Sequence, residues 1–207
     1  MPEAIAPFFW VIVLIFSVII HEVSHGLLAL HLGDDTAKRA GRLTLNPMKH
    51  LDPVGSFLVP LGLYVLTMGQ FMFGWARPVP YDPRFLKNPK AAEGMIAAAG
   101  PMSNLLLAIL FAGIAKLLFA AQAPLPATFG EFINIIIFVN ILLGVFNAVP
   151  IPPLDGSKIL FSLLPDSMRG IRAWMEHYGM ILLIAFLFIG LPIIGPIIYG
   201  LFSFLAR

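Results

Sequence analysis

Two histidines and a glutamate lie together in an apolar run that holds no other ionisable group for some twenty residues. The run extends from about residue 8 to residue 32, and residues 21–25 read His-Glu-Val-Ser-His. On a helix, positions i and i+4 share one face, so His21 and His25 can each present a ring nitrogen to a single metal ion. Glu22 lies about 100° around the helix, within reach of a metal-bound water. The pattern predicts metal-assisted hydrolysis with Glu22 as the general base.

The position of the motif within the run indicates a functional site. A run of this length predicts a helix that spans a membrane, and burying a histidine or carboxylate there without a partner is expensive. At 1.5 Å per residue, the motif lies about 15 to 20 Å from either end of the run. The alternative is a chance match of a five-residue pattern, which is less expected in a lipid-facing run than in a soluble helix.

Zinc is the metal that this arrangement predicts. Zinc lowers the pKa of a bound water to roughly 7 and polarises the scissile carbonyl of a peptide. A neighbouring glutamate accepts the proton and later passes it to the leaving amine. The chain contains no cysteine, which excludes disulfides, iron–sulfur clusters and thiolate zinc sites. A zinc site must therefore use nitrogen and oxygen ligands.

Asp155 is the candidate for the third protein ligand. Two histidines leave a catalytic zinc one protein ligand short, and a carboxylate is a standard third. Asp155 follows a proline-rich stretch at residues 147–154, where the backbone is expected to be irregular and solvated. A second role is equally open to it, as the N-cap of a helix over residues 157–164.

Three other polar side chains are open to more than one interpretation. Asn104 is expected at membrane depth, where it either joins two helices or lies near the site. His31 is off the metal-binding face of its helix, which favours a place at the membrane interface. His50 follows in a polar loop, and a loop histidine is more often structural than part of a site.

Composition predicts an integral membrane protein with a single membrane-embedded domain over residues 1–207. Hydrophobic residues make up 59% of the chain and charged residues 12%, with a mean hydropathy of +0.91, which excludes an ordinary soluble domain. The net charge of +2 does not indicate nucleic acid, because the basic residues cluster in loops between apolar runs and act there as topology signals. We expect a lipid bilayer as partner and no nucleic acid.

The apolar runs predict an all-α polytopic fold with about four to six membrane segments. After the first run, clear spans are expected at residues 91–121 and 132–149. The loop between these two carries no lysine or arginine, as expected on the non-cytoplasmic side. A last segment, at residues 178–206, contains glycine and proline pairs and should be kinked or broken.

Residues 54–73 are apolar but are interrupted by glycine and proline, and the loops on both sides are basic. If both loops are cytoplasmic, the segment must enter the membrane and return, so a re-entrant segment is favoured over a full span. Two short β-edges are also expected nearby. Residues 42–45 alternate polar and apolar side chains. Residues 79–81, which follow Pro78 and include Pro80 in the second basic loop, are expected to be extended.

Three motifs occur in an order that resembles the site-2 protease family of intramembrane zinc metalloproteases, peptidase family M50. They are the His-Glu-Val-Ser-His motif of the first run, Gly100-Pro101-x-x-Asn104 in the second, and Asn147-x-x-Pro150 followed by Asp155-Gly156 at the end of the third. The resemblance covers about residues 8–160, which would form the catalytic core. The joint occurrence of three motifs in this order is far more specific than any one of them.

The resemblance implies the ligands of one Zn²⁺ ion: His21, His25 and Asp155. It implies Glu22 as the general base. It also places Asn147 near the substrate or the developing oxyanion, where an amide donor could stabilise charge. Asn104 matches a family position with a less defined role.

The resemblance also implies what the protein acts on and where. Family members cut transmembrane helices or leftover signal peptides of membrane proteins, and their core of three helices opens towards the cytoplasm, in agreement with the basic loops. We expect a bacterial or archaeal cell membrane and a transmembrane protein or peptide substrate, held extended by strand addition at the two β-edges. This chain shows neither the PDZ or CBS domain of many relatives nor their helix before the zinc-binding span. Substrate selection is then expected to rest on the membrane segments or on an adaptor, and the sequence does not indicate whether the chain forms homo-oligomers.

Two other classes of function are open. One zinc transporter family carries His-Glu-x-Pro-His-Glu in a membrane helix, but this chain has Ser24 and Gly26 in place of the proline and the second glutamate. A catalytically silent relative would bind membrane helices as a chaperone or scaffold, yet a purely structural zinc site has no need of Glu22. The sequence therefore predicts a zinc metalloendopeptidase that cuts within or next to transmembrane segments.

Overall fold

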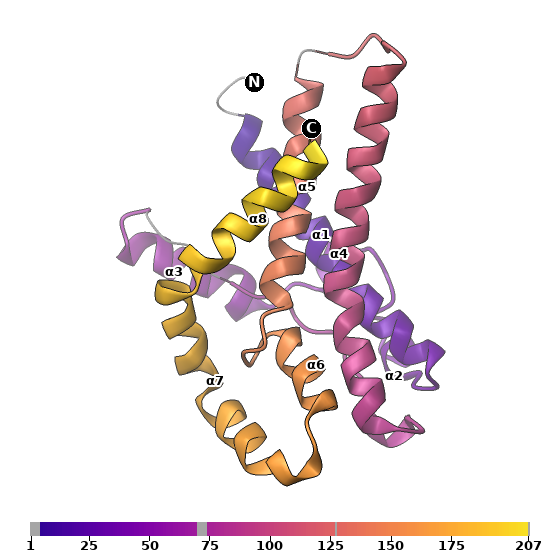
Figure 1. The fold of residues 1–207 in the computed structure, drawn as a ribbon, viewed down its shortest axis with the longest axis vertical. Coiled ribbons are helices and arrows are strands. Elements are labelled where there is room, and N and C mark those ends of the chain that lie inside the picture. The colour runs from indigo at the N-terminus through magenta and orange to yellow at the C-terminus, as the bar shows by residue number, and fades with distance from the viewer. Residues whose placement is uncertain (1–4, 70–73, 127, 207) are drawn as a thin grey trace.

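Four long apolar helices form the frame of the computed structural model, which describes residues 5–69, 74–126 and 128–206 (Figure 1). They are α1 (Ile5–His31), α4 (Pro89–Ala120), α5 (Phe129–Asn147) and α7 (Arg169–Ile189). Each is long and apolar enough to cross a membrane, α7 together with the turn before it. The prediction of an all-α polytopic membrane protein is confirmed.

Shorter helices connect and cover this frame. They are α2 (Thr36–Arg39), α3 (Val59–Leu66), α6 (Asp155–Leu163) and α8 (Leu191–Ala206). Three-residue 3₁₀ turns occupy Pro47–Lys49, Pro83–Phe85 and Asp166–Met168, and a π-helical turn at Pro53–Leu58 leads into α3.

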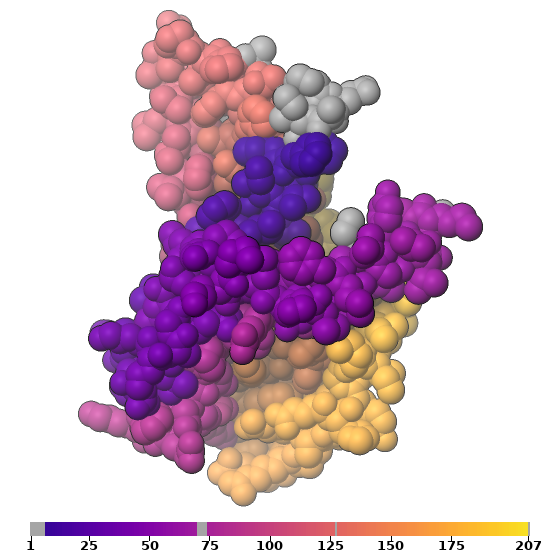
Figure 2. Space-filling view, turned by 180° about the vertical axis from the view of Figure 1, so that it is seen from behind, coloured from indigo at the N-terminus to yellow at the C-terminus, as the bar shows by residue number. Residues whose placement is uncertain are grey.

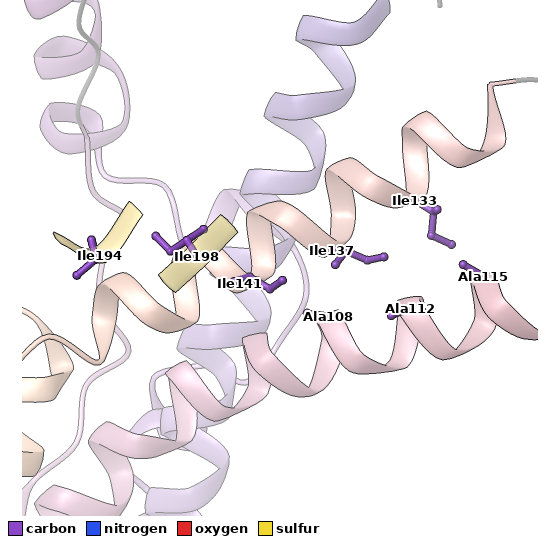
Figure 3. Packing of buried hydrophobic residues seen from close by; sticks show 8 residues of the cluster. All are labelled: Ala108, Ala112, Ala115, Ile133, Ile137, Ile141, Ile194 and Ile198. Carbon is purple, nitrogen blue, oxygen red and sulfur yellow. The ribbon is translucent and has the colours of Figure 1, made fainter. Parts of the chain in front are cut away.

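The helices α1, α4 and α5 pack against one another and make the predicted three-helix core. Alanines on one face of α4 lie against isoleucines of α5, and two isoleucines of α8 close one end of this layer (Figure 3). The residues of this cluster are Ala108, Ala112, Ala115, Ile133, Ile137, Ile141, Ile194 and Ile198. Small side chains let the backbones of two membrane helices approach closely, which stabilises the pair by dispersion contacts.

The segment expected to be re-entrant folds back on itself. The six residues of the π-helical turn and the eight of α3 fall well short of the roughly 20 residues that a span needs. The Trp75 N–H donates to the Gly55 carbonyl at 3.0 Å, so the chain returns to the start of the segment. In Figure 2 the segment projects from the side of the molecule. Residues 70–73 of the expected range lie outside the described residues.

The two expected β-edges are wrong as secondary structure, because the described residues contain no strand. Backbone groups that would pair with each other in a β-ladder form hydrogen bonds with side chains instead. The Arg42 guanidinium donates to the carbonyls of Arg77 and Pro78, and the Val79 N–H donates to Glu22. Pro78 and Pro80 have no N–H to offer, so the second stretch cannot form a regular ladder.

The helix that contains the start of the last apolar run begins earlier in the chain than that run. The helix α7 runs without a break from Arg169 through residue 178, where the sequence predicted the start of the last membrane segment. The predicted break in the run is confirmed, because α7 ends at Ile189 and α8 begins at Leu191. Pro192 lacks the N–H needed to continue α7, which accounts for the position of the break.

Asp34 joins the loop after α1 to the loop before α4. Its side chain is fully buried, and it accepts hydrogen bonds from the N–H and the hydroxyl of Thr36 and from the N–H of Asp82, at 2.5 to 2.9 Å. Burial raises the pKa of this carboxyl, but the hydrogen bonds from Thr36 and Asp82 lower it by more. The pKa of Asp34 therefore lies below its ordinary value, and its contribution to stability is present above the unfolded pKa and lost as the pH falls through the folded one.

Replacing Asp34 by asparagine should destabilise the protein and weaken this acid dependence. The amide would turn an N–H towards one of the donors that the carboxylate now accepts from, and losing a hydrogen bond to a charged group costs about 1.5 to 3 kcal/mol. Thermal unfolding in detergent between pH 3 and 7 measures both effects. Asp35→Asn, which removes only a half-exposed i,i+4 ion pair with Arg39, is the matched control. Parallel pH profiles for wild type and Asp34→Asn would contradict the assignment.

Candidate metal centre

The three predicted ligands meet between α1 and the start of α6. One ligand atom from each of His21, His25 and Asp155 lies within 4.8 Å of the others. The Asp155 Oδ2 atom is 2.9 Å from His21 Nε2 and 3.2 Å from His25 Nε2. The rings are nearly enclosed, with His21 exposing 6% and His25 exposing 9% of its surface. This geometry agrees with a single ion held by two imidazole nitrogens and a carboxylate.

The proline-rich turn after α5 delivers Asp155 to this position. The helix α6 begins at Asp155 with Leu154 as its N-cap residue, so the predicted alternative of an Asp155 N-cap is wrong. The Asp155 carboxylate contacts the two histidines instead. Gly156 makes the tight approach possible, because a Cβ there would overlap the carbonyls of Ala148 and Val149 at the end of α5.

The other nitrogen of each histidine is held by α4. His25 Nδ1 lies 2.6 Å from the Ile96 carbonyl, and His21 Nδ1 lies 2.6 Å from the side-chain oxygen of Asn104. A carbonyl can only accept, so each ring carries a proton on Nδ1, which leaves Nε2 to bind a cation between the ring and Asp155. Such partners orient metal-binding histidines and fix their tautomer.

Gly100 keeps the space beside these lone pairs open. A Cβ added at this residue would lie 2.5 Å from Nε2 of His21 and from Nε2 of His25. Two imidazole nitrogens and one carboxylate oxygen therefore converge on a position that only a glycine on α4 leaves accessible. The donor set and the available space both fit zinc, which accepts nitrogen and oxygen ligands and keeps an open coordination position in catalytic sites.

Glu22 lies beside the ligands and is held by a loop. Its Oε2 atom accepts a hydrogen bond of 2.9 Å from the N–H of Val79. The loop is fixed by Arg42, a side chain only 7% exposed, whose Nη2 donates to the carbonyl of Arg77 at 2.5 Å and to that of Pro78 at 3.3 Å. We call residues 77–79 the strap. The strap gives the carboxylate of Glu22 a defined orientation without making it a ligand.

The remaining candidates lie in several settings. Asn104 lies in the site, against His21, and also bonds to neighbouring helices, so both of its predicted roles apply. The Asn147 side chain donates to the Leu143 carbonyl within α5. His50 is buried in its loop, with Nε2 bonded to the Thr44 carbonyl, and His31 is exposed at the end of α1. Neither histidine belongs to the ligand group found among the described residues.

Two residues that sequence reasoning missed support the site. Asn140 bonds to Asn104, and Ser17 bonds to both of these asparagines. Ser17 precedes His21 by four residues, the spacing that places both on one face of α1. The signal available for Asn140 was its position in the middle of the apolar run 132–149, farther from the ends of the run than Asn134 and Asn147.

Comparisons with known proteins agree with this chemistry. The model of Peptidase family M50 matches residues 9–123 and 113–190. YwhC of Bacillus subtilis (strain 168), provisionally named a zinc metalloprotease, is 42% identical over 184 residues, which cover 87% of this chain and 80% of YwhC. Rip2 of Mycolicibacterium smegmatis, also provisionally named a zinc metalloprotease, is 30% identical over 84% of this chain and 64% of its own length.

A more distant relative comes from an archaeon. MJ0611 of Methanocaldococcus jannaschii, also provisionally named a zinc metalloprotease, is 34% identical over 53% of this chain and 45% of its own length. No solved structure matches the chain. The family model covers well over half of the sequence, including His21, His25 and Asp155. The chain therefore belongs to peptidase family M50, the family that its three motifs resemble.

Proposed function

We propose that the chain is an intramembrane zinc endopeptidase that hydrolyses peptide bonds within or next to membrane-spanning segments of other proteins. One observation carries this proposal. The side chains of His21, His25 and Asp155 converge on a small space inside an apolar helical core, with the carboxylate of Glu22 one residue along α1 from the first ligand. Membership of family M50 supports the same conclusion.

The ligands and the base have separate tasks in this reaction. A zinc ion held by His21, His25 and Asp155 would supply Lewis acidity towards a water and towards the scissile carbonyl. Glu22 takes the proton from the attacking water and transfers it to the leaving amine nitrogen. The Val79 N–H donates a hydrogen bond to Oε2 of Glu22, so the carboxylate is oriented before the reaction begins.

The charges of the loops support access from the cytoplasmic side. The loops that join α1 to α4 hold most of the basic residues of the core: Lys38, Arg39, Arg42, Lys49, Arg77, Arg84 and Lys87. The described part of the loop between α4 and α5 has none. By the positive-inside rule, the end of α1 that carries the site faces the cytoplasm. His25 is six residues from that end, about 9 Å along the helix.

The proposed substrate is a transmembrane segment or a signal-peptide remnant in a bacterial or archaeal cell membrane. The carbonyls inside a helix are hydrogen-bonded to N–H groups four residues further on, so a substrate helix must unwind locally before one of them is attacked. The strap contacts Glu22, and we propose that the unwound part of the substrate lies against the strap. Asn147, at the end of α5, is proposed to lie near the substrate, as the family motif implies.

Zinc content and cleavage, measured on the same preparation, test the proposal. The purified protein should hold about one zinc per chain and cut single-span substrates within their apolar segment in liposomes, as mass spectrometry of the fragments would show. Removing the metal with a chelator should abolish cleavage, and added zinc should restore it. A metal-loaded protein that cuts no substrate would favour the silent binder, and a protein that binds no zinc would refute the assignment of all three ligands.

A further inference from the structure

We propose that Asn140 is a positioning residue that fixes the tautomer of His21 by holding the side-chain amide of Asn104 in one orientation. The proposal rests on the function proposed above, because it concerns the nitrogen that His21 offers to the metal. It assigns a role to a residue on α5 that touches neither the metal ligands nor the base in the described contacts.

A continuous chain of hydrogen bonds joins α5 to the site. The Asn140 Nδ2 group donates to the Ile136 carbonyl at 2.9 Å and to the Ser17 hydroxyl at 3.0 Å. The Asn140 Oδ1 atom accepts from Asn104 Nδ2 at 2.9 Å, and Asn104 Oδ1 lies 2.6 Å from His21 Nδ1. Asn104 is 0% exposed, Asn140 1% and Ser17 3%. No bulk water competes for these groups.

The direction of this chain follows from chemistry. The two ends of an asparagine amide look alike, so their orientation must be deduced from their partners. The Ile136 carbonyl can only accept, which turns Nδ2 of Asn140 towards it and Oδ1 towards Asn104. Asn104 must then present Nδ2 to Asn140, which leaves its Oδ1 for His21. His21 in turn carries its proton on Nδ1 and offers the lone pair of Nε2 to the metal.

Asn104 has a weaker anchor of its own. Its Nδ2 group also donates to the Ser17 carbonyl, but at 3.3 Å, which is longer than each of the other hydrogen bonds described for Asn140 and Asn104. If Asn140 is lost, the amide of Asn104 can turn and offer an N–H to His21 Nδ1. That orientation favours a proton on Nε2, and a protonated Nε2 cannot bind zinc.

The cost of burying Asn140 also indicates a role beyond packing. Its neighbours Val139 and Ile141 are buried, and α5 is otherwise apolar at this depth. An amide in such a place costs free energy unless it is fully hydrogen-bonded, whereas leucine would fill a similar volume at no such cost. A role in joining helices is the structural alternative, and the two roles predict different results for two variants.

Asn140→Leu and Asn140→Asp separate these roles. Leucine removes the bond that orients Asn104 and should weaken zinc binding by about 10-fold or more, towards the roughly 100-fold that loss of a direct partner of a metal-binding histidine can cost. Aspartate, charged or neutral, still turns an acceptor oxygen to Asn104 Nδ2, so zinc affinity should stay close to that of the wild type. A purely structural role predicts that both variants lose zinc in proportion to their loss of stability. Asn134→Leu, an exposed position on the same helix, is the control.

Zinc affinity is measured by competition with a chelator, and the protonated nitrogen of His21 by NMR of ¹⁵N-histidine-labelled metal-free protein. In the metal-free protein the Asp155 carboxylate can draw a further proton onto Nε2, so the readout is the proton on Nδ1. This proton is expected in the wild type and in Asn140→Asp, and is expected to be partly lost in Asn140→Leu. Unchanged zinc affinity and tautomer in Asn140→Leu would overturn the proposal, and so would equal losses in both variants. Should Asn140→Leu not fold, loss of zinc affinity or a changed tautomer in a folded Asn140→Asp overturns it. Neither readout requires cleavage, so a wild type that binds zinc but cuts nothing would refute the proposed function and leave this test intact.

Discussion

Replacing Glu22 by glutamine is expected to abolish cleavage while zinc remains bound. Glutamine has nearly the same shape as glutamate and can still accept the hydrogen bond from the Val79 N–H through its side-chain oxygen. It cannot accept a proton from water at neutral pH. General base catalysis contributes roughly 10²- to 10⁴-fold to rate, so the cleavage rate should fall by at least this factor. The three ligand atoms belong to other residues, and zinc content should stay at the wild-type level.

The comparison needs a second glutamate changed in the same way. Glu176→Gln alters an exposed residue of α7 that pairs with Arg172, and it should leave both cleavage and zinc content unchanged. Rates in liposomes and metal content by mass spectrometry are then compared for the three proteins. Retained cleavage in Glu22→Gln would show that another group acts as the base. A loss of zinc would show instead that Glu22 supports the ligands.

Replacing Gly100 by alanine is expected to remove zinc and cleavage together. The added Cβ would lie 2.5 Å from Nε2 of both histidines, closer than any van der Waals contact. The rings cannot withdraw freely, because each Nδ1 is bonded to α4 itself, at Asn104 and at Ile96. Either the methyl group occupies the place of the ion or α4 moves away from α1. Both results should weaken zinc binding by more than 100-fold, about 2.7 kcal/mol or more.

Gly113 provides a matched control on the same helix. A Cβ at this position meets nothing within 4 Å, so Gly113→Ala should leave zinc affinity unchanged. It should also stabilise α4 slightly, because alanine is favoured over glycine in a helix by up to about 1 kcal/mol. Zinc titrations of both variants, with helix content by circular dichroism, decide the matter. A Gly100→Ala protein with wild-type affinity would mean that the ion lies elsewhere.

The sequence predicted the ligands well because their signals are strong and local. His21 and His25 have helical spacing inside a run too apolar to carry them by accident. Asp155 was found because zinc needed a third ligand and a broken helix end was available. Its second interpretation, as a helix cap, could be excluded only once the structure placed its carboxylate against the histidines.

The wrong or missed predictions concern residues whose structure depends on a partner that lies far away in the sequence. The alternation at residues 42–45 predicted a strand, but a strand needs a neighbour with free N–H groups. Pro78 in the strap and Pro80 beside it have no N–H. Asn140 was missed for a related reason. A single asparagine has no spacing pattern, and its importance depends on Asn104, 36 residues away in the sequence.

The separation of the ligands along the chain determines when the site is completed during synthesis. Asp155 follows His21 by 134 residues, and it lies at the start of α6, which packs on α4. Chains emerge and fold from the N-terminus, so an incomplete chain carries the base and two imidazoles but no third ligand. Such a chain offers a metal ion only two of the three ligand groups. The order of synthesis therefore delays the completion of the ligand set until the last part of the core has been made.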